Sequence, residues 1–576
     1  PNIRLPIAFA SVVGGLLPSY AFRGQCQPTS VFRNAHPISL IRKYYPVDPR
    51  HVDTTTTTAT LHKSIHFASV FSDASASVDS FANNEDTLSA AVDALNAVLD
   101  SSDCPIRDIK VRAALLPTSC RIGLVATKDI GADENFLSVP LSTCGSPRDV
   151  FDPKISPSLA PVLPEKYDGW TGDAGLLAML LLKETLLPRN ELWAAWIQCL
   201  PTIDEATDTL PMLWDELAQE VLQSSSTKKI YRILDDADED TTWLEENIWS
   251  ADRVSFPAST ERLRGSNPHP LFSLDGFRWA LAIVNSRAVF IDGTLMLAPV
   301  ADFANHADFV GGEGSGQPAE AALGYTGTFG ITKAVRLATG KGRGSKLRAG
   351  DQAVISYGPK SAAEYLLDHG FVPPSASISS VSELTFEIDE SDRFGDDKID
   401  VLEFETYGGA MDPMQSFDVY GGPGSMGNPD PAMLQFLRLQ KLNNKDAFLL
   451  ESVFRKEVWG FMADPVSEEN EADVVDAILD ACETALEDMN SVPSSDTVFS
   501  DRRLNDCATV RDAERRALSM LSEYMTREKE ALDLKEYYQQ RRLKSLGLDS
   551  NWEDENSPDV GWGPGRNPGG AESDFF

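Results

Sequence analysis

The sequence predicts an α+β fold in which a β core of short strands is interrupted by a helical insertion and followed by an all-α domain. Two brief β-type runs, RIGLVATKDI and ENFLSVP, lie within residues 105–140 and are separated by a turn. Apolar stretches at 171–223 and 274–290 have the composition of buried helices. Strand signals return at TLMLAPV and DQAVISY, and the patterns beyond residue 380 are mostly helical.

These patterns divide the chain into consecutive segments. The second part of the insertion, 224–270, is acidic and is predicted to be irregular, whereas a long amphipathic run from about 508 to 546 predicts a helix. The end of the chain is rich in Gly, Pro and acidic residues, which is typical of disorder. We expect a disordered leader at 1–75, a linker with a short helix at 76–104, the β core at 105–373 with its helical insertion at about 151–270, a helical domain at 380–546 and a disordered tail at 547–576.

Composition excludes several functions. The 576 residues carry a formal net charge of −36, which disfavours binding to a nucleic-acid backbone and favours solubility. The seven Cys form no CxxC pair and the seven His are scattered, so no metal site is expected. Because no segment after the leader is apolar for 18 residues, we expect no membrane-spanning helix and no membrane partner.

The first 72 residues differ from the rest of the chain. They contain seven Lys or Arg against two acidic residues and are rich in Ser, Thr and Pro, a composition typical of a transit peptide. The apolar run at 5–18 has about the length of a signal-peptide core and ends before an Ala-Phe step at 21–22. Together these features resemble the two-part presequence of algae with complex plastids. They predict the plastid stroma, with the cytoplasm as the alternative.

Two segments carry most of the functional information. LAPVADFANHADF contains Asn305 and His306, and VISYGPKSAAEYLLDHGF contains Tyr357. Together with RWALAIVNSRAVF and the opening strand pair, they resemble the cofactor and active-site half of a SET-domain methyltransferase. The resemblance is to the group with a long insertion, which includes the Rubisco large-subunit lysine methyltransferases. It implies a SET-domain β core with a pseudoknot, followed by an all-α substrate-binding domain.

The resemblance also implies the cofactor, S-adenosyl-L-methionine. Asn305 and His306 match the Asn-His pair that binds it in the family, with main-chain atoms of the pair contacting the adenine. Glu134, Asn135 and Phe136 match a second cofactor contact in the opening block. The family usually has Gly where Arg121 stands, so the backbone that faces the cofactor is expected to differ here.

Tyr357 matches the catalytic tyrosine of the family. Methyl transfer is an in-line displacement at a sulfonium carbon, and it needs a neutral amine held about 3–3.5 Å from the methyl group. A phenol oxygen and neighbouring carbonyl oxygens can orient that amine and contact the polarised methyl hydrogens. A narrow, partly dry channel would also lower the pKa of a substrate lysine.

Three further residues match positions that face the substrate or cofactor in relatives. Arg287 and Asp302 are charges within apolar segments, and pairing with each other is the alternative explanation. His369 stands in a DHGF turn where lysine-specific relatives commonly carry Tyr. We assign all three to substrate binding and leave open which acceptor they select.

We therefore expect an S-adenosylmethionine-dependent protein-lysine N-methyltransferase acting as a monomer on a plastid protein of the Rubisco large-subunit or aldolase type. One alternative is a protein-histidine methyltransferase on the same fold. Another is a non-catalytic binding or assembly protein that uses the SET fold as an interaction surface. The pH dependence of the rate separates the first two, because imidazole is neutral near pH 7 and a lysine amine is not.

Overall fold

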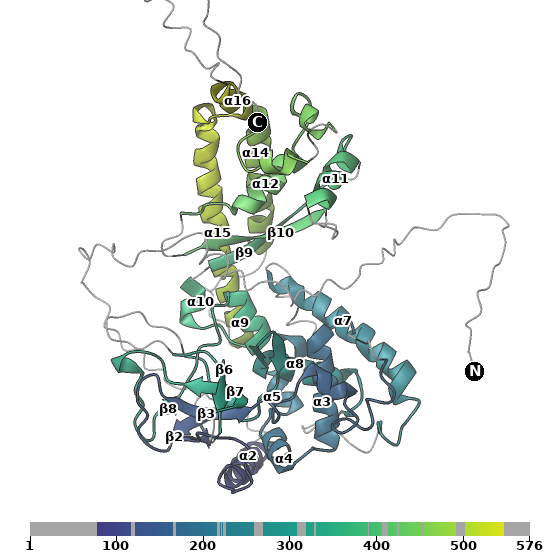
Figure 1. The fold of residues 1–576 in the computed structure, drawn as a ribbon, viewed down its shortest axis with the longest axis vertical. Helices are drawn as coiled ribbons and strands as arrows, with labels where there is room; N and C mark the ends of the chain where they lie inside the picture. Colours follow the sequence, from purple (N-terminus) through teal and green to yellow (C-terminus); the bar gives the residue numbers. More distant parts are fainter. Residues whose placement is uncertain are drawn as a thin grey trace, which may run out of the picture. The chain divides into compact units, whose positions relative to one another are not determined.

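The computed structural model describes residues 78–546 with internal gaps (Figure 1). The gaps are 117–120, 165–166, 168, 216–218, 220–221, 223–225, 259–268, 308–317, 328–329, 379, 390, 406–412, 423–425, 452–453, 455 and 491–501. The predicted leader and tail, and the Gly-rich stretch at 311–316, lie outside the described residues.

The chain enters the β core through helix α2 (Val78–Leu99), which is longer than the short helix predicted for the linker. Val92, Leu95 and Leu99 of this helix are buried in the main core, at spacings that place them on one helical face. Asn96 exchanges two hydrogen bonds with the backbone of Ala113 in β1, at 2.9 and 3.0 Å. The helix is therefore packed against the β core and is not a detached linker.

Small antiparallel sheets form the β core. One has the order β1-β2-β8, built from β1 (Val111–Leu115), β2 (Ile122–Ala126) and β8 (Gln352–Ala353). A second has the order β3-β7-β6, built from β3 (Asn135–Pro140), β7 (Thr332–Ala338) and β6 (Ala322–Thr326). A two-stranded hairpin joins β4 (Val289–Ile291) to β5 (Thr294–Met296). Strands that are over 200 residues apart in sequence, such as β2 and β8, thus become neighbours.

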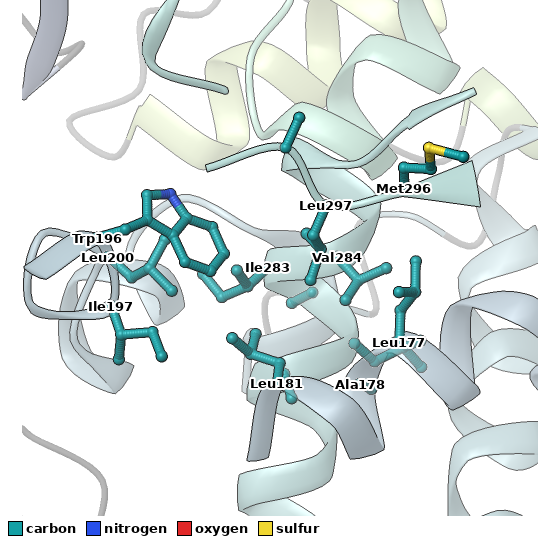
Figure 2. Close-up of a cluster of buried hydrophobic side chains, with 14 of the residues drawn as sticks. Leu177, Ala178, Leu181, Trp196, Ile197, Leu200, Ile283, Val284, Met296 and Leu297 are labelled. Atoms are coloured by element: carbon teal, nitrogen blue, oxygen red, sulfur yellow. The ribbon is translucent and has the colours of Figure 1, made fainter. Parts of the chain in front are cut away.

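The helical insertion packs its helices around one apolar centre. It contains η1 (Pro147–Phe151), α3 (Gly172–Leu186), α4 (Glu191–Gln198), α5 (Ile203–Thr207), η2 (Pro211–Leu213) and η3 (Ser226–Lys228). Figure 2 shows Leu177 and Leu181 of α3, Trp196 of α4 and Ile283 of α8 (Leu274–Arg287) gathered with Leu297 in this centre. The nearly continuous burial of α3 explains why its sequence is apolar on all sides.

The prediction of irregular structure at 224–270 was wrong for its first half. Helix α7 (Lys229–Leu244) is followed by a π turn, η4 (Glu245–Trp249). The helix buries a face with spacings of three and four residues, made by Ile230, Leu234, Ala237, Thr241 and Leu244. The many acidic residues between these positions obscured the period. One of them, Asp240, is itself buried and accepts hydrogen bonds from Tyr167 Oη and from the backbone of Trp170 and Thr171.

The C-terminal region is mostly helical, as expected, but it is not all-α because β9 and β10 form an antiparallel pair. Its elements are α10 (Pro374–Ile378), β9 (Ser380–Glu387), α11 (Gly395–Glu405), β10 (Met414–Gly421), α12 (Pro431–Gln440), η7 (Asp446–Leu450), α13 (Val458–Phe461), α14 (Glu468–Asn490), α15 (Arg502–Glu530), η8 (Leu532–Leu534) and α16 (Tyr538–Ser545). The run AFLLESVFRKEVWGFM at 447–462 predicts a single helix, which is not what the structure shows. Only its two ends are helical, as η7 and α13, and they are joined by turns such as the one closed by Glu457 N to Phe454 O at 2.8 Å. The long helix begins at Arg502 and ends at Glu530, earlier at both ends than predicted.

Two apolar cores result, and α15 contributes to both. Cys507, Val510 and Ala513 belong to the core of the β domain and its insertion. Leu518, Leu521 and Met525 belong to the second core, which β9, β10, α12 and α14 also build. Among residues 78–546 as described, no helix is long and apolar enough to cross a bilayer. The domain boundaries given above stay predictions.

Candidate active site

The Asp-Phe-Ala-Asn-His turn lies at the centre of the β core. It begins at Val300, a fully buried residue with φ of 75°, and continues as the turn η5 (Ala301–Phe303). A β-branched residue with positive φ is strained by about 1–3 kcal/mol, and such strain persists where the surrounding packing imposes it. The backbone then pairs in parallel with Ile355, whose N–H donates to Asn305 O at 3.0 Å. The turn is thereby held against the segment that carries Tyr357.

Asn305 is fixed by the opening strand pair. Its amide Nδ2 donates to the carbonyl of Ile122 in β2 at 3.0 Å. Gly123 follows Ile122, and a Cβ at Gly123 would lie 3.0 Å from Asn305 Nδ2 and 2.6 Å from Leu116 Cδ1. Glycine is therefore needed at 123 because the strand backbone closely approaches the Asn305 side chain.

Tyr357 is held at both its backbone and its hydroxyl. Its N–H donates to Nδ1 of His306 at 3.2 Å, and its hydroxyl donates to the carbonyl of Ala304 at 3.1 Å. The acceptor role of Nδ1 makes the other ring nitrogen of His306 the protonated one when the ring is neutral. The residues on either side of Asn305 thus orient the predicted catalytic tyrosine.

Five aromatic side chains surround this point and form what we call the aromatic cluster: His306, Tyr357, Tyr365, His369 and Phe371. Ring centroids lie 5.3 Å apart for His306 and Tyr357, 5.0 Å for His306 and Tyr365, and 4.7 Å for Tyr357 and His369. Phe371 lies 5.7 Å from Tyr365. The Tyr365 hydroxyl donates to Gly358 O at 2.7 Å, which fixes the Tyr-Gly turn.

Helix α9 (Ala362–His369) carries two of the five rings of the aromatic cluster, Tyr365 and His369. A capping box starts it, in which Glu364 N donates to Ser361 Oγ and Ser361 N donates to a Glu364 carboxylate oxygen. Gly370 ends it with φ of 72°, and a Cβ there would lie 2.3 Å from Thr209 O. The glycine of DHGF is thus required both by its left-handed backbone and by its close packing.

Arg287 and Asp302 form an ion pair, the alternative considered from the sequence. Arg287 Nη1 lies 2.8 Å from Asp302 Oδ2, and Trp196 of α4 donates its indole N–H to Asp302 Oδ1 at 2.9 Å. Burial raises the pKa of Asp302, and the Arg287 charge and the Trp196 hydrogen bond oppose that shift. The guanidinium also lies over the Phe303 ring, 5.5 Å from its centroid. This pairing orients the turn that leads to Asn305, and a direct substrate contact stays a prediction.

Most side-chain groups of the second predicted cofactor contact, Glu134–Phe136, are engaged by other parts of the protein. Glu134 pairs with Lys110 at 2.6 Å, which lowers the pKa of Glu134, and the Phe136 side chain is fully buried. Asn135 donates to Asp108 and Ser138 at 2.8 and 2.7 Å. Its Oδ1 is buried and accepts no hydrogen bond from any described residue, so this side chain retains a site for a donor group. No described contact joins Glu134 or Asn135 to Asn305.

Arg121, the position where the family has Gly, makes a connection that sequence reasoning missed. It keeps a left-handed backbone, with φ of 55°. Its guanidinium pairs with Glu205 at 3.1 Å and donates to the carbonyls of Cys199 and Leu200, at 2.6 and 3.4 Å, beyond the end of α4. The end of helix α4 therefore contacts two parts of the site. The carbonyls that follow the helix accept hydrogen bonds from Arg121, next to the opening strand pair, and Trp196 within the helix donates to Asp302. The Trp193–Trp196 spacing was visible in the sequence, but its partners were not.

The arrangement defines a class of protein. Hydrogen bonds from an Asn-His turn hold a tyrosine within an aromatic cluster. The Asn side chain packs against a strand at a position where only glycine fits. The unsatisfied Asn135 Oδ1 fits a bound polar cofactor. No group of three His, Cys, Asp or Glu side chains in the described part of the chain could hold a metal. These are features of a SET-domain protein methyltransferase.

Comparisons with known proteins agree with this class. Residues 389–532 match the family model described as Rubisco LSMT substrate-binding. The chain is 31% identical over 446 residues to the chloroplastic Rubisco large-subunit N-methyltransferase of Nicotiana tabacum, covering 76% of this chain and 82% of the relative. It is 30% identical to the chloroplastic fructose-bisphosphate aldolase-lysine N-methyltransferase of Arabidopsis thaliana, covering 74% and 82%. The crystal structure of the LSMT SET domain bound to lysine and AdoHcy superposes with a TM-score of 0.63 at 28% identity, over 81% of this chain and 98% of that one.

The chain belongs to the Rubisco large-subunit methyltransferase-like family of SET-domain lysine N-methyltransferases. The predicted fold class, a SET core with a helical insertion followed by a helical substrate-binding domain, is confirmed. The predicted enzyme class and the S-adenosyl-L-methionine cofactor are confirmed by the same relatives. The roles of the individual site residues stay predictions.

Proposed function

We propose that this protein transfers a methyl group to the ε-amine of a lysine in a plastid protein. Rubisco large subunit and fructose-bisphosphate aldolase are the candidate substrates, because two of the most similar relatives act on them. The chloroplastic location of these relatives supports the plastid location predicted from the leader. The observation that carries the proposal is Tyr357, clamped by His306 and Ala304 within the aromatic cluster.

The chain's own residues perform positioning and desolvation in this proposal. S-adenosyl-L-methionine, when bound, supplies a methyl group on a sulfonium, and Asn305, His306 and the Glu134–Phe136 stretch would hold it. Tyr357 donates its hydroxyl proton to Ala304 O, so toward any other group its oxygen acts as an acceptor. An acceptor at this place orients the amine N–H groups and directs the nitrogen lone pair at the methyl carbon.

The aromatic cluster serves the second requirement, a neutral amine. Tyr365 is buried, and neighbouring rings of the cluster have centroids 4.7–6.2 Å apart. A channel with such walls disfavours the charged ammonium and lowers the pKa of the substrate lysine. The helical region at 380–546 is the proposed docking domain for the protein substrate. We propose a monomer that acts without nucleic acid or membrane.

Methyl transfer to purified Rubisco and to purified plastid aldolase tests this function. Radiolabelled S-adenosyl-L-methionine and the full chain should label one of the two proteins, and mass spectrometry should place the label on lysine. Tyr357→Phe and Asn305→Ala should abolish labelling. Tyr325→Phe is the matched control, because Tyr325 is exposed on β6 and should leave labelling unchanged.

Two outcomes would overturn the proposal. Label on a histidine would establish the protein-histidine alternative. The rate of methyl transfer to a histidine should stop rising above about pH 7, whereas the rate of transfer to a lysine should continue to rise up to about pH 10. Absence of both labelling and cofactor binding would favour the non-catalytic alternative. An apparent mass in gel filtration larger than that of one chain would refute the monomer.

A further inference from the structure

Arg121 combines a strained backbone with an extensively bonded side chain. Its φ of 55° lies in the left-handed region, which residues with a Cβ rarely adopt. Its Nε and Nη2 each lie 3.1 Å from a different carboxylate oxygen of Glu205, so guanidinium and carboxylate meet through two contacts. Backbone strain that the surrounding contacts maintain is a reason to look for a function.

On one side, Arg121 directly precedes the strand residue that holds Asn305. The carbonyl of Ile122, the next residue, accepts a hydrogen bond from the Asn305 amide at 3.0 Å. The carbonyl of Arg121 itself accepts the N–H of Leu116 at 3.0 Å, which joins the end of β1 to the start of β2. A shift of the Arg121 backbone would therefore move the carbonyl that fixes Asn305, a predicted cofactor residue.

On the other side, the partner of Arg121 begins helix α5. Oε2 of Glu205 accepts the N–H of Thr202 at 2.7 Å, and the N–H of Glu205 donates to Thr202 Oγ at 3.3 Å, which completes a capping box. Arg121 also donates to the carbonyls of Cys199 and Leu200, just before this helix. Because α5 has only five residues, fixing its first turn fixes its last.

The far end of α5 reaches the aromatic cluster. The hydroxyl of Thr209, two residues after the helix, donates to the carbonyl of Glu205 at 3.2 Å. The carbonyl oxygen of Thr209 packs so closely on Gly370 that a Cβ there would lie 2.3 Å from it. Gly370 ends α9, which carries two rings of the aromatic cluster. A continuous set of contacts thus joins Arg121 to the acceptor side of the site.

We propose that Arg121 is a positioning residue that couples the cofactor strand β2 to the aromatic cluster through Glu205 and α5. In this role it contacts neither cofactor nor substrate. Cofactor binding that fixes Asn305 also fixes β2, and the paired contacts with Glu205 carry this restraint to the turn at Gly370. By linkage, occupancy of the acceptor side should tighten cofactor binding. The inference rests on the proposed roles of Asn305 and the aromatic cluster and deepens them.

Amide hydrogen exchange of the full chain, with and without S-adenosyl-L-homocysteine, tests this coupling. In the wild type the ligand should slow exchange at residues 203–210 by roughly fivefold or more. In Arg121→Gly and in Glu205→Gln, the slowing should fall below about twofold, while cofactor affinity stays within about threefold of the wild type. Both substitutions suit their positions, because Gly favours the left-handed backbone and Gln retains the capping box of α5.

Arg278→Ala is the matched control. Arg278 pairs with Asp238 at 2.5 Å, and the two side chains are 26% and 48% exposed, against 21% and 31% for Arg121 and Glu205. This pair joins α8 to α7, and no described hydrogen bond of Arg278 reaches β2 or α5. The ligand should therefore slow exchange at 203–210 in this variant as much as in the wild type.

Three results would overturn the inference. The first is a wild type in which the ligand leaves exchange at 203–210 unchanged, and the second is an Arg121→Gly variant in which the slowing persists. The third is a parallel loss of slowing at 301–306 and of cofactor affinity, which would make Arg121 a structural support of the cofactor site alone. Lower overall stability cannot imitate the expected pattern, because each protein is compared with itself with and without ligand.

The exchange experiment is independent of the acceptor protein. If the wild type labels neither Rubisco nor aldolase, the proposed substrates are wrong, and the exchange comparison still decides the role of Arg121. If one of them is labelled, Arg121→Gly should lower kcat by about tenfold and change KM by less than about twofold, because it disturbs alignment and not contact. An unchanged kcat would contradict the positioning role.

Discussion

Two arginine–carboxylate pairs with buried carboxylates, one in each of the two halves of the molecule, use the same chemistry for different ends. Arg438 of α12 pairs with Glu471 of α14 at 2.5 Å, and its Nη1 donates to the carbonyls of Met462 and Ala463. Lys535 adds a second cation to Glu471 at 3.3 Å. Both partners are almost fully buried, so this network ties α12, α14 and the chain after α13 together.

The pair Arg287–Asp302 is more exposed to solvent than the pair Arg438–Glu471. The side chain of Asp302 is 1% exposed and that of Arg287 is 20% exposed. Asp302 divides its two oxygens between Arg287 and the Trp196 indole, and lies three residues before Asn305. The first network stabilises a helical core, whereas the second orients a turn whose next residues are predicted to face the cofactor. Equal burial of a carboxylate thus does not imply an equal role.

Removal of either carboxylate should produce the largest effect. Glu471→Ala leaves the buried Arg438 unpaired and should lower the free energy of unfolding by about 3–5 kcal/mol. Asp302→Ala should cost less stability, because Arg287 is 20% exposed and can be solvated. At a temperature where both variants are folded, Asp302→Ala should weaken S-adenosyl-L-methionine binding by roughly tenfold, through displacement of Asn305. Glu471→Ala should leave cofactor binding within about twofold. Calorimetry measures both, and equal cofactor affinities would contradict the distinction drawn above.

A third buried carboxylate, Glu514, is hydrogen-bonded to a serine, and its contribution to stability should depend on pH. Glu514 of α15 accepts hydrogen bonds from the backbone and hydroxyl of Ser226, and burial raises its pKa to about 7. Because the folded pKa lies above the unfolded one, this group's contribution to stability is full at acid pH and is lost as pH rises toward 7. Relative to Glu514→Gln, the wild type should lose roughly 3 kcal/mol between pH 5 and 8, at 1.36 kcal/mol per pKa unit. Thermal unfolding of both proteins across this range checks it, and a constant difference would contradict it.

Tyr357→Phe should separate chemistry from stability. It removes the hydrogen bond to Ala304 O and the acceptor oxygen proposed to orient the amine, so kcat should fall by about 100-fold. The phenyl ring keeps the packing of the aromatic cluster, so the midpoint of thermal unfolding and the affinity for S-adenosyl-L-homocysteine should change little. A parallel loss of stability and rate would instead place Tyr357 with Arg438 and Glu471, as a packing residue.

The smallest expected effect on stability concerns Arg121. Its left-handed backbone favours Gly, while its guanidinium joins β2 to Glu205 and to the carbonyls after α4. Arg121→Gly loses these contacts and relieves the strain, whereas Arg121→Ala loses the same contacts and keeps it. The Gly variant should therefore be about 1 kcal/mol more stable than the Ala variant in chemical unfolding. Equal stability of the two would show that the turn relaxes when the side chain is shortened.

Local patterns predicted much of the fold and part of the site. Buried helices such as α3 and α8 were visible because nearly all their residues are apolar, and β2 and β3 were visible as short β-type runs between turns. Helix α7 was missed because its acidic residues hide a buried face of only five positions. A single helix was overpredicted at 447–462 because apolar residues there fill the second core from two short helical segments, η7 and α13, and the turns beside them.

The sequence by itself determined the class of enzyme, because Asn305, His306, Tyr357 and the DHGF turn lie in short, contiguous segments whose resemblance to a known family can be seen without the fold. Only the tertiary structure decided what those residues touch. Trp196 reaches Asp302 across 106 positions, Arg121 reaches Cys199 across 78, and His369 reaches Ser286 across 83. Hydrogen bonds between distant segments depend on which elements pack side by side, and no local pattern encodes them.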